Sequence, residues 1–237
     1  MRASLAGTLL VFALAVAGCG SSSPSGSTNA GGNAEALKSG QQVLTDAVNA
    51  AEGASSFRMS GTINTGGQQI GLDLTIVKGK GAQGSMTIGG QKVDLVIVGA
   101  DAYMNAGAAF WTQFGGTSGS AIAQLVAGKW FKFSTTDPQF SSITGLTDSK
   151  SLFDSLSSSA GTITNKGATT YKGQSAVAIF AGSKNGTLYV ATTGVPYPIA
   201  IAKTGAAEGG AIAFGDWDKS VTLTAPSGAI DSSQLGG

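Results

Sequence analysis

Alternation between apolar and polar side chains, repeated in run after run from position 57 onward, restricts this chain to a fold built on β-strands. In the first run every second residue is apolar or small: Phe57, Met59, Gly61 and Ile63. The alternation resumes after Thr65-Gly66-Gly67, with apolar residues at Ile70, Leu72, Leu74 and Ile76. A period of two is typical of a strand with one buried face, and glycines between two such runs indicate a hairpin.

The same pattern continues along the chain as a meander. Met86 and Ile88 precede Gly89-Gly90, after which the apolar residues of the next run are Val93, Leu95 and Ile97. Further strands are predicted at residues 102–105, 129–134, 162–166, 174–181, 187–192, 199–203, 211–216 and 221–225. Because short turns make successive strands antiparallel neighbours, we expect one large, strongly curved antiparallel sheet.

A few segments have helical periodicity instead. From Ala34 to Ala51 the apolar residues recur at spacings of three and four: Leu37, Val43, Leu44, Ala47, Val48 and Ala51. Shorter helices are predicted over Ala121–Ala127 and Ser149–Ser158. The chain is therefore expected to have an α+β fold, in which the N-terminal and middle helices cover one face of the curved antiparallel sheet.

The first residues have the form of a secretory leader. Arg2 is followed by an apolar run from Leu5 to Val16, which at about 12 residues is too short for the roughly 20 needed to span a bilayer. The run ends in Val16-Ala17-Gly18-Cys19, where small residues precede the only cysteine, as in a bacterial lipobox. A buried structural cysteine is the alternative. We expect an acylated Cys19 that holds the protein on the outer face of the cell membrane.

A tether is predicted between this anchor and the folded part. Residues 20–33 carry no charge and no large apolar side chain, so they cannot offset the entropy cost of becoming ordered. A Gly/Ser chain of this length has an average end-to-end distance of about 20 Å. The predicted organisation is a signal peptide at 1–18, the acylated cysteine and tether at 19–33, and a single domain at 34–237.

Charge and residue types exclude several functions. Loss of the leader leaves 13 of the 14 basic residues against 13 acidic ones, so clustered positive charge for nucleic acid or anionic lipid is not indicated. The chain has no histidine and no cysteine besides Cys19. Ser-His-Asp and Cys-His catalysis and His/Cys zinc sites are therefore excluded, and neither enzyme activity nor a metal or cofactor is expected.

Two local motifs match functional patterns, but a turn is the simpler explanation of each. Gly79-Lys80-Gly81-Ala82-Gln83-Gly84 matches the dinucleotide fingerprint, but a strand rather than a helix follows, so we favour a turn. Asp216 and Asp218 flank Trp217 and invite a catalytic or calcium-binding interpretation. No further oxygen ligands are spaced to complete a calcium shell, so a solvated turn is favoured.

Trp111, Trp130 and Trp217 are candidates for a sugar-stacking platform, with packing in the core or at its rim as the favoured alternative.

The apolar face of the sheet is the main candidate site. Its residues would line either a filled core or an enclosed cavity for a small molecule or lipid, and the sequence leaves both open. The cavity candidates are Ile70, Leu72, Leu74, Ile76, Met86, Ile88, Val93, Leu95, Ile97, Phe131 and Phe133.

A lid is predicted over the mouth of this face. Gly115–Ser120 and Thr135–Leu146 are rich in Gly, Ser and Thr and flank the middle helices, so those helices are expected to move. A fixed packing role is the alternative for the aromatic residues concerned. These lid candidates are Phe110, Trp111, Phe114, Phe140 and Phe153.

In the order of its features the chain resembles the mycobacterial LppX/LprAFG lipoproteins, whose fold is similar to that of the LolA/LolB carriers. The resemblance rests on the lipobox, the tether and these segments: Phe57-Arg58-Met59-Ser60-Gly61, Asp101-Ala102-Tyr103-Met104-Asn105 before Trp111, Gly186-Thr187-Leu188-Tyr189-Val190 before Tyr197-Pro198-Ile199, and Phe214-Gly215-Asp216-Trp217 before Val221-Thr222-Leu223 and Pro226. It implies a half-barrel of antiparallel strands with a few helices over its concave face, LolA/LolB-like, which encloses a hydrophobic cavity for acyl chains of lipids or lipoglycans. It implies no catalytic residues.

The leading hypothesis is an anchored lipoprotein that binds and carries lipid or lipoglycan in the envelope, with an envelope transporter as a possible partner. The alternative is an extracytoplasmic sensor or accessory scaffold with a filled core and a protein partner.

Overall fold

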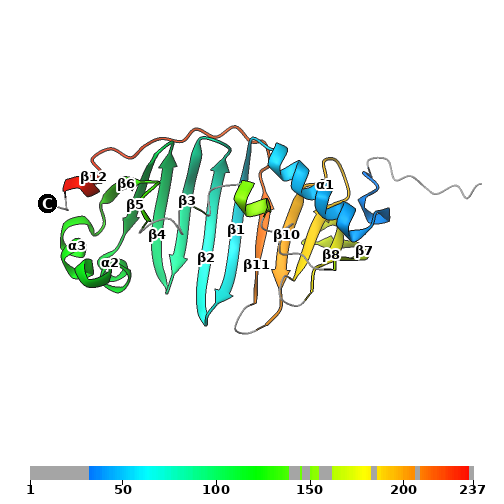
Figure 1. The fold of residues 1–237 in the computed structure, drawn as a ribbon, viewed down its shortest axis with the longest axis horizontal. Helices are drawn as coiled ribbons and strands as arrows, with labels where there is room; N and C mark the ends of the chain where they lie inside the picture. Colours follow the sequence, from blue (N-terminus) through cyan, green and yellow to red (C-terminus); the bar gives the residue numbers. More distant parts are fainter. Residues whose placement is uncertain are drawn as a thin grey trace, which may run out of the picture. The chain divides into compact units, whose positions relative to one another are not determined.

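A single twelve-stranded sheet forms the centre of the protein (Figure 1). The computed structural model describes residues 32–138, 145, 150–154, 162–182, 186–205 and 209–234. The strands are β1 (Ser56–Thr65), β2 (Gln68–Val77), β3 (Gly81–Ile88), β4 (Gln91–Val98), β5 (Asp101–Ala106), β6 (Trp130–Ser134), β7 (Thr164–Tyr171), β8 (Gln174–Phe180), β9 (Thr187–Ala191), β10 (Pro198–Lys203), β11 (Gly210–Gly215) and β12 (Ile230–Asp231). Their order in the sheet is β12-β6-β5-β4-β3-β2-β1-β11-β10-β9-β8-β7.

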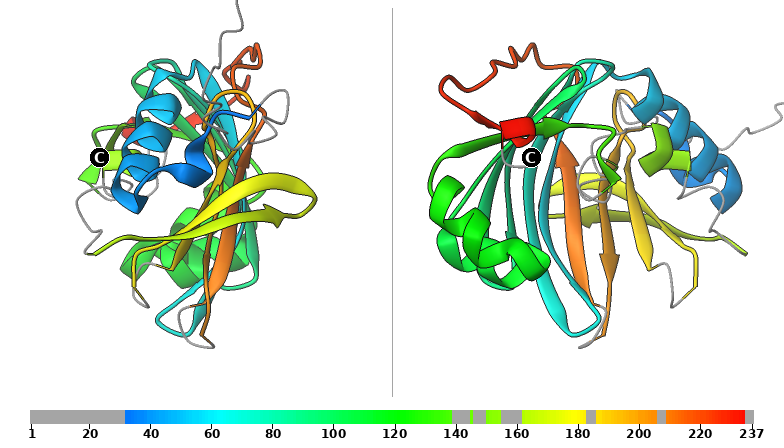
Figure 2. Two further views of the ribbon diagram at one scale, coloured as in Figure 1. Left: turned by 90° about the vertical axis from the view of Figure 1, so that its right-hand side faces the viewer. Right: turned by 60° about the vertical axis from the view of Figure 1, so that its left-hand side comes forward.

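The predicted fold class is confirmed. Neighbouring strands are antiparallel, except that the short β12 pairs parallel with β6. The sheet is strongly curved, as Figure 2 shows, and it does not close. The pairing of β1 with β11 joins the two halves of the chain, so that one apolar face continues across both.

Helix α1 (Gly40–Gly53) follows a short 3-10 helix, η1 (Glu35–Leu37). Ser39 begins α1 with a capping box, in which its hydroxyl accepts from Gln42 N and Gln42 Oε1 accepts from Ser39 N. The predicted helix therefore starts later than Ala34, and Leu37 lies outside its apolar face, 89% exposed. The other predicted apolar residues of this helix are buried: Val43, Leu44, Ala47, Val48 and Ala51.

Two short helices, α2 (Ala108–Phe114) and α3 (Gly119–Val126), pack together between β5 and β6, with η2 (Gly116–Ser118) joining them. Of these, only α3 was predicted. Gly115 and Gly119 allow the close packing, because a Cβ at either would lie 2.4 Å from the carbonyl oxygen of Trp111. Residues 150–154 are helical, within the predicted Ser149–Ser158. None of the helices in the described ranges is long and apolar enough to cross a membrane.

The predicted strand at 221–225 is wrong. Both edges of β11 are already paired, to β1 and β10, so the following residues find no free strand edge. They run instead in extended form past the ends of the strands toward β12 and the short helix η4 (Ser232–Gln234), as Figure 1 shows. Their exposure still alternates, because one side of this extended segment faces the protein.

The turn predicted at Gly79–Gly84 is only partly correct. The turn ends at Lys80, and Gly81 and Gly84 lie within β3 with φ values of +136° and +147°. A Cβ on either glycine would stand 2.0 Å from a carbonyl oxygen of the neighbouring strand, Ile97 O and Asp73 O respectively. Close packing of the strands therefore explains these glycines better than phosphate binding does.

Candidate functional site

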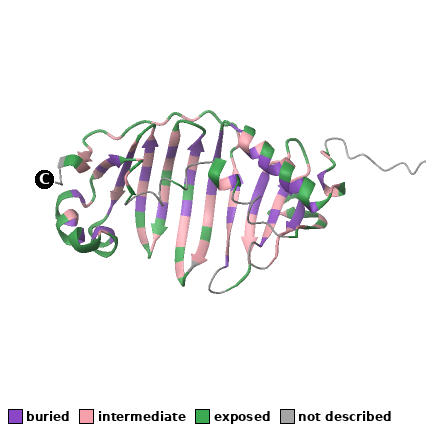
Figure 3. Cartoon of the chain, in the orientation of Figure 1, coloured by how far each residue is buried: buried purple, intermediate pink, exposed green. Residues whose placement is uncertain are grey.

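All residues predicted to line a cavity lie on the concave face of the sheet. They come from β2, β3, β4 and β6, and they belong to one apolar cluster, with Ile70 and Ile88 partly buried against it. Figure 3 shows the buried residues alternating along these strands. The period of two in the sequence thus correctly places these residues on one face.

Burial on this face decreases toward one end. Leu74, Val93 and Leu95 have no exposed surface at all. We call the end of the face beside the β1–β2 and β3–β4 turns the hairpin end. There Ile63, Ile70 and Ile88 are paired side by side across β1, β2 and β3 and are only partly buried. The centre of the face is therefore packed, whereas its hairpin end offers apolar surface to solvent.

The sequence argument missed a large part of this face. Residues from β5, β1, β8, β9 and β11 complete the cluster: Ala102, Met104, Ala106, Phe57, Met59, Val177, Ile179, Leu188, Val190, Ile212 and Phe214. Most of these also alternate along their strands. In β5 the signal was obscured because Ala102, Tyr103 and Met104 are consecutive and all buried.

The predicted lid residues fall into separate aromatic groups. Phe110, Trp111 and Phe114 lie on α2, where the Trp111 ring meets Phe131 of β6 edge-on at 5.5 Å. Phe114 is 39% exposed and reaches the Gly89 turn at the hairpin end.

Phe153 is fully buried elsewhere, against Phe57 at 5.4 Å and Phe214 at 5.7 Å. Phe140 lies outside the described residues.

The indole nitrogen of Trp111 is a buried donor without a partner. Trp111 is 2% exposed, and its Nε1 atom donates no hydrogen bond within the described structure. A buried N–H left unpaired costs roughly 1–3 kcal/mol. An acceptor brought into the apolar face by a ligand would remove this cost.

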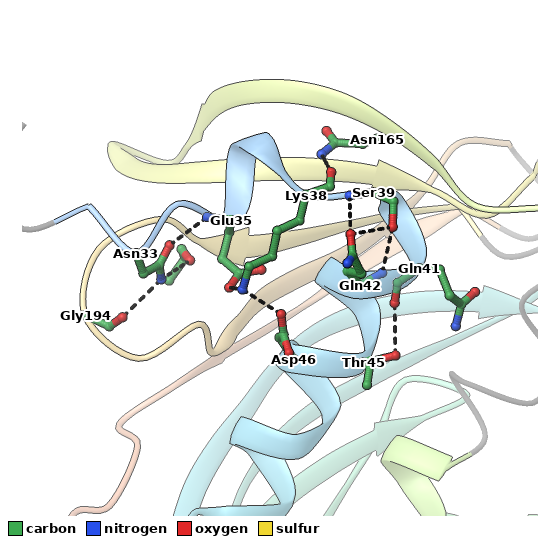
Figure 4. A network of polar contacts seen from close by, with 11 residues as sticks. Asn33, Glu35, Lys38, Ser39, Gln41, Gln42, Thr45, Asp46, Asn165 and Gly194 are labelled. Carbon is green, nitrogen blue, oxygen red and sulfur yellow. Dashed lines mark hydrogen bonds and ion pairs between the residues drawn. The ribbon is translucent and has the colours of Figure 1, made fainter. Parts of the chain in front are cut away.

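Gly32 and Asn33, which precede the predicted start of the domain at residue 34, make contacts with the β9–β10 connection. Gly32 bridges Thr193, and the Asn33 side chain donates to Ala191 O at 2.9 Å and Gly194 O at 3.0 Å (Figure 4). We call residues 32–38 the N-terminal strap.

Its charged side chains hold the strap to α1. Lys38 Nζ lies 2.7 Å from Asp46 Oδ2 and 2.6 Å from Glu35 Oε1, and both carboxylates raise the pKa of Lys38. The N-terminal strap is therefore attached both to the β9–β10 connection and to α1.

The Asp216–Asp218 segment forms the predicted turn, and hydrogen bonds and ring stacking fix this turn to the rest of the domain. Asp218 accepts hydrogen bonds from Ser55 N at 2.7 Å and from the Tyr197 hydroxyl at 2.5 Å. Trp217 stacks on Tyr197 at 4.4 Å with an interplanar angle of 5°.

The three tryptophans do not form one platform. Trp111 lies in the core and Trp130 in β6, whereas Trp217 follows β11, which is separated from β6 by β5, β4, β3, β2 and β1.

We predict that the Tyr197–Asp218 bond is visible in a tyrosine titration. The bond to Asp218 raises the pKa of Tyr197 from its ordinary value of 10.0 to about 12. Because the folded pKa is raised, the bond contributes stability below pH 10.0, and this contribution is lost as the pH rises to about 12. Ultraviolet absorbance should show a tyrosinate forming near pH 12 that moves toward pH 10.0 in Asp218→Asn. An unchanged titration curve would contradict the bond.

The convex face is polar. Arg58 donates to both carboxylate oxygens of Asp73 at 2.7 Å, which lowers the pKa of Asp73. Near this pair a shallow hollow of about 330 Å³ is lined by polar side chains that include Gln83 and Asp94. No three His, Cys, Asp or Glu side chains in the described part of the chain come together as a metal site.

The solved structure of LprF shares this fold. LprF from Mycobacterium bovis aligns with a TM-score of 0.55 and 15% identity, over 84% of this chain and 100% of LprF. The lipoprotein LppX from Mycobacterium tuberculosis aligns with a TM-score of 0.49 and 13% identity, over 78% of this chain and 97% of LppX. Neither a family model nor a curated protein matches the sequence. The resemblance to the LppX/LprAFG lipoproteins is thus confirmed for the fold.

Proposed function

We propose that this chain is a membrane-anchored extracytoplasmic lipoprotein whose concave face binds the acyl chains of a lipid or lipoglycan and carries them within the cell envelope. The observation that carries the proposal is the continuous apolar face of an open, curved sheet, with burial that decreases toward the hairpin end. The fold shared with LprF and the lipobox at Cys19 support it.

Ligand entry is proposed at the hairpin end, beside Ile63, Ile70 and Ile88. Phe114 of α2 is partly exposed there, and Leu125 of α3 is 50% exposed. Because Leu74, Val93 and Leu95 are completely enclosed, acyl chains reach them only when the covering elements move apart. The small pair α2–α3 is the proposed moving part, since it is short and a glycine lies in each of its outer connections, Gly107 before α2 and Gly128 after α3.

The Leu95→Trp substitution tests whether ligand occupies this face. The larger side chain takes up ligand space, so we expect native mass spectrometry of protein isolated from cells to show several-fold less bound lipid. Because the cover can move, stability should fall by less than the about 1–3 kcal/mol typical of an overpacked core. The control is Val96→Trp, which adds the same bulk to the opposite face of β4. Unchanged lipid together with the full overpacking cost would contradict the proposal.

Trp111 gives the proposed site a polar contact. We expect its Nε1–H to donate to the ester carbonyl of a bound lipid, which supplies the acceptor that the free protein lacks. Trp111→Phe should then weaken binding of a diacyl phosphatidylglycerol about tenfold while leaving its dialkyl ether analogue nearly unchanged. Trp130→Phe is the control, and a calorimetric titration gives both affinities. Equal losses for the ester and the ether lipid would rule out this hydrogen bond.

A sensor or accessory scaffold with a filled core is the second candidate, because the centre of the concave face is packed. In that case the exposed apolar residues at the hairpin end would meet a protein partner rather than admit a lipid. The Leu95→Trp experiment separates the two, since only a lipid carrier loses bound lipid.

A further inference from the structure

A pocket of about 440 Å³ opens at the end of the sheet where β8, β9, β10 and β11 meet their connections. Ile199, in its wall, belongs to a small apolar cluster with Ala176 and Ala200 that is separate from the main core. The volume falls within the range of small-molecule sites. Phe214 of the concave face also lines this pocket, with Trp217 packed against the same apolar cluster, but the inference does not depend on the lipid proposal.

The aromatic part of the pocket is held rigidly. Tyr197 and Trp217 both line it, and their rings are stacked at 4.4 Å. Trp217 stands between Asp216 and Asp218, whose φ values of +53° and +58° are unusual for residues other than glycine. Hydrogen bonds from Ser55 and Tyr197 to Asp218 maintain this turn. The aromatic pair is thus positioned before any ligand arrives.

The polar part of the lining is neutral or acidic. Gln174, Ser175 and Thr193 are exposed and line the pocket, and none of its described lining residues is a lysine or an arginine. Asp216 also lines it, and Lys219 Nζ lies 2.6 Å from the Asp216 carboxylate. Because the described lining includes an acidic residue and no basic one, its chemistry favours a neutral ligand with several hydroxyl groups.

We propose that this pocket binds a neutral saccharide unit. The C–H face of a sugar ring packs on aromatic rings, and its hydroxyl groups exchange hydrogen bonds with amide, hydroxyl and carboxylate groups. Both kinds of surface are adjacent here. Trp217 is stacked between Tyr197 at 4.4 Å and Phe57 at 5.1 Å, so the ring offered to a sugar is that of Tyr197, which Trp217 supports from behind. The polar residues beside it are Gln174, Ser175 and Asp216.

The N-terminal strap links the pocket to the anchor. Asn33 binds Ala191 O and Gly194 O, and Thr193, which pairs with Gly32, lines the pocket. If Cys19 is acylated, the tether keeps the pocket at about 20 Å from the headgroups on average. The saccharide can therefore come from a glycolipid headgroup or from a free glycan.

Saturation-transfer difference NMR tests the free sugar. The full chain, kept in a detergent without sugar groups, is mixed with methyl glycosides of glucose, galactose and mannose. We expect transfer to the ring C–H protons of at least one glycoside, lost in Trp217→Leu and about tenfold weaker in Gln174→Ala. Gln69→Ala, an exposed glutamine on β2, is the matched control and should bind normally. Because methyl glycosides have no acyl chain, lipid binding on the concave face does not affect this result.

Hydrogen exchange tests the headgroup. The full chain is placed in phosphatidylcholine vesicles with or without digalactosyldiacylglycerol, and protection is compared at residues 191–198 and 215–219. Protection that depends on the glycolipid and is lost in Gln174→Ala assigns the headgroup as the source, and binding of a methyl glycoside assigns a free glycan as well. Binding in neither experiment, or binding that Trp217→Leu and Gln174→Ala leave unchanged, overturns the proposal.

Discussion

Cys19→Ala is expected to abolish acylation and, with it, the stable attachment of the processed chain to the membrane. Each acyl methylene buried in a bilayer contributes about 0.8 kcal/mol, so the loss of two or three chains removes nearly all of the membrane affinity. Incorporation of labelled palmitate, followed by fractionation of cells, measures both effects. Because an uncleaved leader could itself act as an anchor, the variant carries a leader that a general signal peptidase removes.

The released chain should remain folded. Residues 32–38 are held by contacts within the domain, from Asn33 to the β9–β10 connection and from Lys38 to Asp46. Circular dichroism and thermal unfolding of the released chain should therefore match those of the anchored protein. Ser22→Ala in the tether is the control and should stay at the membrane. A Cys19→Ala chain that remains firmly attached after leader removal would contradict the lipobox interpretation.

Gly84→Ala is expected to have the largest effect on stability, a loss of about 4 kcal/mol or more in the free energy of unfolding. Its φ of +147° is unfavourable for alanine, and a Cβ there would lie 2.0 Å from Asp73 O in β2. That backbone atom cannot move without disturbing the pairing of β2 with β3. Since native domains are stable by only about 5–15 kcal/mol, much of the variant should be unfolded at moderate urea concentrations.

Two matched glycine variants separate the cost of a positive φ from the cost of a close contact with the neighbouring strand. Gly66→Ala, in the β1–β2 turn, has a φ of +57° with no atom within 4 Å of the new Cβ, so it should cost only about 1–2 kcal/mol. Gly53→Ala, at the end of α1, has neither problem and should be neutral or slightly stabilising. Urea unfolding followed by circular dichroism gives the three values. Similar losses for Gly84→Ala and Gly66→Ala would show that close approach of the strands is not the cause.

Elements with local repeats were predictable. The strands from β1 to β4 have apolar residues at every second position, and one face of each packs in the core. The same rule failed at 221–225, because an extended segment that lies against the protein alternates in exposure without pairing as a strand. Helix α2 was missed because its seven residues are too few to show a helical period, and tertiary packing of Phe110 and Trp111 stabilises it.

The sequence by itself determined which side chains of β2, β3 and β4 share the concave face, because alternation along a strand is a local property. It also provided the lipobox-like pattern before Cys19, on which the predicted anchor rests. Only the tertiary structure decided which of these side chains meet: Phe153 packs on Phe57 and Phe214, and Asn33 holds Ala191, 158 positions away. The pocket lined by Tyr197 and Trp217 likewise depends on the register of β8 to β11. Such contacts join residues distant in the chain, and their energies depend on strand pairing that no local pattern specifies.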